Sequence, residues 1–414
     1  MNLGRFSMGI GDRFARQGRA QLSAFVEARR AGIEVTPVWN KSHREHSIVG
    51  SVPADVRREA DEAVKALGWT GEYRVDADHI GLGTVDAFLN ASDFFTLDVA
   101  HFIGRPAPET DIRAFCSRHA GLAREIALPG LDRPITVTAA AIEAAARKYL
   151  LAVLEASKTW RHIAVAKGAD TFITEVSMDE TDLPQTPAEL LLILAAIADE
   201  QIPARTIAPK FTGRFNKGVD YEGDPEAFAR EFEADVAVAA FATREFGLPA
   251  GLKLSVHSGS DKFSLYPHLR AVLARTGAGL HLKTAGTTWL EELIGLAAAG
   301  GEGLAVAKDV YAGAFARYDE MVTPYAAVIH VRRGDLPPVA DVMRMTPFDF
   351  TSALRHDPRN PRFNSQFRQF LHVSYKVAAE MGRRFPDALD ACEATVADNV
   401  GTNILDRHLR PVFG

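Results

Sequence analysis

The sequence predicts an α/β fold: a (β/α)8 barrel of the TIM type with one insertion and extra C-terminal helices. Short apolar runs alternate with helical patterns along the first 290 residues, which is typical of βα units and a parallel sheet. Eight such runs are found, the number that a closed barrel requires. An open doubly wound sheet is the main alternative, but no GxGxxG fingerprint follows an early strand.

The strand candidates are rich in β-branched and aromatic residues. They are residues 5–10, 33–39, 72–77, 94–99, 171–176, 205–211, 251–257 and 278–284. The helical patterns between them carry the expected end signals. Residues 56–68 follow Pro53 and end at a glycine, and residues 225–247 have proline near their start and glycine at their end.

Two regions depart from this alternation. Residues 100–140 contain the loop sequence GRPAPETD and predict an insertion. From about residue 291 onward, patterns such as LEELIGLAAAGG and ALDACEATVADNV predict helices that pack outside the barrel. We therefore expect a barrel over residues 1–290 and a C-terminal helical region over residues 291–414.

The composition bounds the class of protein. With 414 residues and 47% hydrophobic content, the chain can bury a large core. A net charge of −6 gives no electrostatic footprint for nucleic acid. The sequence has only two cysteines and no signal-peptide pattern. It also has no apolar run of the roughly 18 residues that span a membrane. These features favour a cytoplasmic protein. We expect no nucleic-acid or membrane partner and allow for a homo-oligomer.

Polar and ionisable residues follow almost every predicted strand, at the ends where barrels carry their chemistry. They include Asn40 and Lys41, Asp76 and Asp78, Asp98, Glu175, Lys210 and Arg214, the run from His257 to Lys262, and His281 and Lys283. The opposite ends carry mostly Gly, Trp, Thr and Ala. A single Asp or His after a strand is usually a helix cap or a loop residue, and Asp261 fits an N-cap. The asymmetry as a whole favours an active site.

Four of these ionisable residues, Glu175, Lys210, His257 and His281, stand among apolar neighbours within predicted strands. A charge buried there is costly unless it is paired or bound to a metal. Two histidines and a carboxylate from separate strands suit a divalent ion: zinc, nickel, manganese or iron. We predict Glu175, His257 and His281 as the ligands, with Asp76, Asp78 and His79 as the source of a further one.

The segment SGSDK (258–262) leads into a helical pattern, and the free N–H groups at a helix start suit an anion. We expect this loop, with Lys41 or Arg214, to hold a carboxylate or terminal hydroxyls of a small substrate. The predicted substrate-binding residues are Asn40, Lys41, Arg214, Ser258, Ser260, Asp261, Lys262 and Lys283.

Several stretches together resemble the tagaturonate epimerase family of bacterial hexuronate metabolism. They are GIGDRF (9–14), PVWNKSHREHSIVGSVP (37–53), VDADHIGLGTVD (75–86), KFTGRFNKGVDYEGD (210–224), LSVHSGSDKFSLYP (254–267) and LHLKTAGTTWLEEL (280–293). The resemblance spans most of the first 300 residues, in the same order. It implies a metal-dependent enzyme that interconverts D-tagaturonate and D-fructuronate. Some relatives act on tagatose and fructose, so a ketohexose 4-epimerase is an alternative.

The two sugar acids differ at C4, which is β to the C2 ketone. A retro-aldol step can break C3–C4, and re-forming the bond on the other face of the aldehyde inverts C4. The step requires a Lewis acid, an acid/base for the C4 hydroxyl and cations near the enediolate. Asp76 or Asp78 fits the acid/base role, and Lys210 and Lys283 supply the cations.

Four further readings stay open. Lys210 forming a Schiff base would give a metal-independent aldolase, and a ketose isomerase fits the same barrel. Transient oxidation at C4 would ask for a nicotinamide cofactor, but no dinucleotide fingerprint is present. A non-catalytic sugar-binding barrel does not explain the number of ionisable strand ends.

Overall fold

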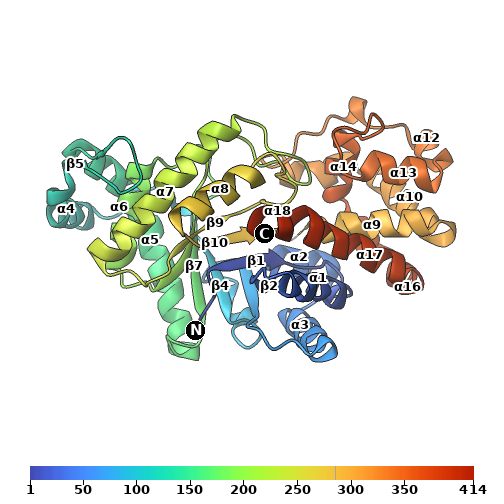
Figure 1. The fold of residues 1–414 in the computed structure, drawn as a ribbon, viewed down its shortest axis with the longest axis horizontal. Coiled ribbons are helices and arrows are strands. Elements are labelled where there is room, and N and C mark those ends of the chain that lie inside the picture. Colours follow the sequence, from blue (N-terminus) through green and yellow to red (C-terminus); the bar gives the residue numbers. More distant parts are fainter. Residues whose placement is uncertain (285) are drawn as a thin grey trace.

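The computed structural model describes residues 1–284 and 286–414. Eight parallel strands close into a barrel in the order β1-β10-β9-β8-β7-β4-β3-β2, which confirms the predicted fold (Figure 1). The strands are β1 (Phe6–Ile10), β2 (Thr36–Ser42), β3 (Arg74–Ile80), β4 (Phe94–Asp98), β7 (Ile173–Ser177), β8 (Ala204–Ala208), β9 (Lys253–Val256) and β10 (Leu280–Lys283).

Seven helices lie between β1 and β9 in the sequence, and their ends carry the proline, capping and glycine residues that the sequence analysis identified. They are α1 (Gly18–Arg30), α2 (His43–Val49), α3 (Pro53–Leu67), α4 (Glu109–Arg118), α5 (Ala139–Lys167), α6 (Pro187–Asp199) and α7 (Pro225–Phe246); α8 (Tyr266–Thr276) then leads to β10. The Asp224 side chain caps α7, and Gly247 ends the helix in the left-handed conformation.

β2 and β3 continue about three residues past the predicted strands, to Ser42 and Ile80. The apolar run marks only the part of a strand that packs against the surrounding helices. The strand itself goes on, because polar side chains at the mouth of the barrel find partners on neighbouring strands. Asp76 therefore lies inside β3, opposite Asn40 of β2.

The predicted insertion lies between β4 and α5. It holds α4 and a small antiparallel sheet of β5 (Glu125–Ile126) and β6 (Ile135–Thr136). Figure 1 shows it at one end of the molecule, with most of the C-terminal helices at the other. No helix in the described ranges has the length and apolar content that crossing a membrane would need.

The C-terminal region is helical and shares a hydrophobic core with α1 and α3. Its helices are α9 (Thr287–Ala299), α10 (Gly301–Ala316), α11 (Tyr318–Val322), α12 (Val339–Arg344), α13 (Pro347–Leu354), α14 (Ser365–His372), α15 (Tyr375–Glu380), α16 (Arg384–Ala391), α17 (Glu393–Ile404) and α18 (Arg410–Phe413). α17 packs on α1 and α9, and α18 packs on α8. The chain end thus lies between α8 and α1, where a barrel of this type carries its eighth helix. The division at residue 290 stays a prediction.

Candidate active site

A cavity of about 730 Å3 opens at the C-terminal ends of the barrel strands. Strand ends and the loops after β1, β7, β8 and β9 line it, together with Pro324, Tyr325, Ala327, Val328, His372 and Tyr375. Of the predicted site residues, it is lined by Asn40, Asp78, Lys210, Arg214, His257, Ser258, Ser260 and Lys283. Those that do not line it are Lys41, Asp76, Glu175, Asp261, Lys262 and His281.

Lys283 is the charged centre of the site. Its ammonium lies 2.9 Å from Asp76 Oδ2, 2.7 Å from Asp78 Oδ1 and 3.0 Å from Glu175 Oε1. It also donates to the hydroxyl of Thr96, 2.5 Å away. Burial alone would lower the pKa of Lys283, but the three carboxylates outweigh it and raise that pKa well above the ordinary value. Lys283 is therefore a permanent cation that faces the cavity.

The three acids around Lys283 differ in protonation. Burial raises the pKa of Asp76 to about 6, with Lys283 opposing and Asp78 and Glu175 adding to the rise. Burial also favours the neutral form of Asp78, but Lys283 and His79 outweigh it and hold its pKa below the ordinary value. The pKa of Glu175 is likewise held well below normal by Lys283 and His257. Asp78 is thus the ionised carboxylate of this group that reaches the cavity.

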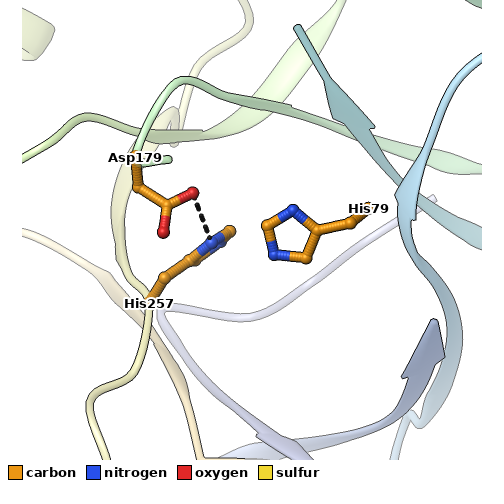
Figure 2. Close-up of side chains that lie close together, drawn as sticks. All are labelled: His79, Asp179 and His257. Carbon is orange, nitrogen blue, oxygen red and sulfur yellow. Dashed lines mark hydrogen bonds and ion pairs between the residues drawn. The ribbon is translucent and has the colours of Figure 1, made fainter. Parts of the chain in front are cut away.

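His257 connects two acids at the cavity floor. Its Nε2 lies 2.8 Å from Glu175 Oε1, and its Nδ1 lies 3.0 Å from Asp179 Oδ1. Figure 2 shows the His79 ring beside it, and the two ring centroids are 5.2 Å apart. His79 lies 3.8 Å from Asp98 Oδ2 and 3.9 Å from Asp78 Oδ1. Acidic oxygens thus surround both imidazoles.

His79 reaches the cavity because β3 is irregular. In a regular strand, neighbouring residues point to opposite faces, so Asp78 and His79 would not share one. The pairing of β3 with β4 shifts register between Ala77 and Ile80, and His79 has a φ of 50°. Such a bulge re-aims side chains near functional sites. Periodicity in the sequence carries no sign of it.

The donor set of His79, Asp179 and His257 fits a divalent metal. One ligand atom of each lies within 4.8 Å of the others. Burial would lower the pKa of His79, but Asp78 and Asp98 raise it to about 10; Asp179 and Glu175 similarly raise that of His257 to about 9. These surroundings favour positive charge, and two imidazoles with a carboxylate are common ligands of zinc and related ions.

Only His257 belongs to both this cluster and the predicted ligand set of Glu175, His257 and His281. The His281 side chain is fully buried, and its Nδ1 lies 2.9 Å from the Ser7 hydroxyl. Burial lowers the pKa of His281 to about 3, so the ring is neutral. Its Nε2 has no partner among the described residues. Glu175 lies on the Lys283 side of His257.

The loop after β9 differs from the expected anion site. Helix α8 begins only at Tyr266, so residues 258–262 are not a helix N-terminus. The Lys262 ammonium donates to the carbonyls of Asn216, Val219 and Ser260 at 2.7–3.1 Å. Asp261 is fully buried. Both residues shape the loop rather than face the cavity, while Ser258 and Ser260 of the same loop do line it.

Lys41 likewise points away, with its ammonium 2.6 Å from the Arg13 carbonyl. Lys210 and Arg214 line the cavity and form no ion pair among residues 1–284 and 286–414. Residues that were not predicted as site residues also line the cavity; besides Asp179, they include Arg13, Arg44, Lys217, Tyr325, His372 and Tyr375. Tyr325, His372 and Tyr375 come from the C-terminal region, which carries no strand-end pattern.

A closed parallel barrel with ionisable side chains gathered at the C-terminal ends of its strands is the arrangement of (β/α)8-barrel enzymes. The model of the UxaE family, tagaturonate epimerase, matches residues 1–383. The chain belongs to this family, and it is an epimerase of the isomerase class.

Two named proteins are similar to this chain. The tagaturonate/fructuronate epimerase of Thermotoga maritima is 27% identical over 380 residues, which cover 90% of this chain and 73% of that protein. The native crystal structure of the fructuronate-tagaturonate epimerase UxaE from Cohnella laeviribosi superposes with a TM-score of 0.79 at 24% identity, over 100% of this chain and 82% of that one. A glycerol complex of the same enzyme gives a TM-score of 0.76 over 98% and 82%. These structures share the fold.

Proposed function

We propose that this enzyme interconverts D-tagaturonate and D-fructuronate by inverting C4, with the ketone counted as C2. One observation carries the proposal: a permanent cation, Lys283, and an ionised carboxylate, Asp78, face one cavity beside the donor cluster of His79, Asp179 and His257. Cleaving a β-hydroxy ketone needs a base, a cation near the enediolate and an activated ketone.

A divalent metal ion is part of the proposal. His79, Asp179 and His257 would hold it, and it would act as the Lewis acid that polarises the C2 ketone oxygen. Glu175 accepts a hydrogen bond from one side of His257 and fixes the orientation of its ring. If Glu175 and His281 are ligands instead, His257 is the residue common to both sets.

Asp78 takes the proton of the C4 hydroxyl in this proposal. Asp78 lines the cavity, whereas the more basic Asp76 does not. A general base must first be within reach of the proton that it removes, and only then does its pKa matter. As the C3–C4 bond breaks, its electron pair passes into the enediolate, which the Lys283 ammonium stabilises. The aldehyde then rotates so that its opposite face is directed at C3 of the enediolate. C3 attacks that face, and Asp78 returns the proton to the C4 oxygen. No oxidant or reductant is consumed.

The test is incubation of the purified protein with D-tagaturonate, followed by proton NMR for D-fructuronate. Asp78→Asn should slow turnover by about 10²- to 10⁴-fold, because it removes the proton acceptor while the metal stays bound. The exposed Asp86→Asn is the matched control and should keep wild-type turnover. Borohydride trapping of the wild type with substrate tests the Schiff-base alternative at Lys210: a covalent adduct there would replace this mechanism.

A further inference from the structure

A group of cations lies in the cavity wall beside the C-terminal region. Arg13 follows β1, Arg44 lies in α2, and Lys217 lies in the loop after β8. The Arg44 guanidinium is 4.8 Å from the ring centroid of Tyr325, and that of Arg13 is 4.4 Å from the ring centroid of Tyr375. The two tyrosines therefore hold both arginines at the cavity.

Lys217 belongs to the same group. Its backbone N–H donates to the carbonyl of Val328, 2.8 Å away, which holds the loop after β8 against the rim. Burial lowers the pKa of Lys217; Glu180 opposes this, whereas Arg13 and Arg44 lower it further. The two arginines thus lie close enough to Lys217 to repel its charge.

These positive charges are incompletely balanced by the protein. Arg13 forms an ion pair with Glu45. Arg44 and Lys217 have no carboxylate partner within 4.0 Å in the described part of the chain, although both line the cavity. Gathering like charges in a partly enclosed wall costs free energy that an anion would recover.

The tyrosine pair offers a further donor. The hydroxyls of Tyr325 and Tyr375 are 2.9 Å apart, so one of them donates to the other. The second hydroxyl proton has no protein acceptor in the described ranges, and both residues line the cavity. A carboxylate here would meet two cations and a hydroxyl, a charge-assisted set of donors.

We propose that Arg44 and Lys217, supported by Arg13 and the Tyr325–Tyr375 pair, bind the carboxylate of the sugar acid and distinguish it from a neutral ketose. The inference rests on the proposed function for the identity of the sugar. Of the two expected carboxylate partners, Lys41 is bonded to the Arg13 carbonyl and does not line the cavity, whereas Arg214 does line it and stays a prediction. Cleavage of the C3–C4 bond leaves an aldehyde of three carbons, C4 to C6, which carries the carboxylate. Binding of this carboxylate would also keep the aldehyde in the site while its C4 carbonyl group rotates.

The test compares D-tagaturonate with D-tagatose, which differ in the carboxylate. Isothermal titration calorimetry gives Kd for each sugar, and proton NMR gives kcat/KM. Arg44→Gln and Lys217→Met should each weaken uronate binding by about 10- to 100-fold, the effect of losing a hydrogen bond to a charged group. Tagatose binding should change by less than about threefold, since its C6 hydroxyl carries no charge.

Two variants outside the cavity serve as controls. Arg333 also stacks on a tyrosine, 5.7 Å from the ring centroid of Tyr318, and Lys308 is a half-buried lysine bonded to the Met343 carbonyl. Arg333→Gln and Lys308→Met should bind both sugars as the wild type does. Arg44 is exposed, so Arg44→Gln should fold even where Lys217→Met does not.

Three outcomes would overturn the proposal: equal losses for both sugars, no loss for the uronate, or a wild type that binds the two sugars equally. The proposed function is tested separately, by whether the wild type epimerises D-tagaturonate. A wild type that binds D-tagaturonate through Arg44 and Lys217 without epimerising it would keep this subsite and reject the proposed reaction.

Discussion

Arg368 and Asp261 form a fully buried ion pair, with a guanidinium nitrogen 2.5 Å from the carboxylate, although 107 residues separate them in the sequence. Arg368 also donates to the carbonyls of Gly218 and Leu354. Arg368 of α14 thus contacts two loops. One is the loop after β9, which carries His257, Ser258 and Ser260, and the other is the loop that carries Lys217. The C-terminal region therefore helps to position two loops that line the cavity.

Arg368→Met should destabilise the fold by about 3–5 kcal/mol, because it removes the guanidinium that pairs with the buried Asp261 carboxylate and leaves that carboxylate beside the imidazoles of His356 and His408. Urea unfolding measures the change. The double variant Arg368→Met/Asp261→Asn should recover part of the loss, since it also removes the orphaned charge. Arg317→Met breaks an exposed pair with Glu380 and should cost at most about 1 kcal/mol. Equal losses in both single variants would mean that burial of the pair has no special weight.

The metal proposal predicts which histidine variants lose the ion. His79→Ala and His257→Ala should bind substoichiometric metal after dialysis, because each removes one of three donors. His281→Ala should keep its metal, since that ring is deeper in the barrel beside Ser7. Metal content is measured by mass spectrometry of the protein solution. Loss of metal in His281→Ala, with full occupancy in His79→Ala, would restore the ligand set expected from the sequence.

Asp235 of α7 predicts a pH-dependent cost to stability. It is fully buried, and neither carboxylate oxygen has a hydrogen-bond partner in the described ranges. Burial, with a contribution from Glu231, raises its pKa well above the ordinary value. An acid whose folded pKa is raised costs nothing below its unfolded pKa, about 4, and destabilises the fold progressively as pH rises above that value.

Asp235→Asn should therefore stabilise the protein at pH 7, on the order of 1–3 kcal/mol, and have little effect near pH 3.5. Thermal unfolding of both proteins from pH 3.5 to 8 shows the difference. A constant difference across this range would mean that Asp235 does not titrate differently in the folded state.

The barrel was predictable because an apolar run marks each strand locally, and polar residues directly after each run mark the strand ends at the cavity. Three features of the site were not predictable. His79 was expected only as one source of a further ligand, and the bulge that brings its side chain to the cavity changes no residue pattern. Helix α8 begins five residues later than the charged segment at Asp261 indicates. Arg368 and Tyr375 act from distant helices. Such contacts depend on how separate elements pack, which periodicity does not report.

The retro-aldol mechanism predicts where isotopes go. The aldehyde keeps the hydrogen on C4, and C3 of the enediolate is attacked by that aldehyde rather than by a proton. Substrate deuterated at C3 or at C4 should therefore epimerise in water with both labels retained, and mass spectrometry of the product measures this. Transient oxidation at C4 would instead give a primary isotope effect there, because the C4–H bond would break. Loss of the C3 label to solvent would indicate enolisation at that carbon, and it would turn the carboxylate of Asp78 from a base for the C4 hydroxyl into a base for the C3 proton.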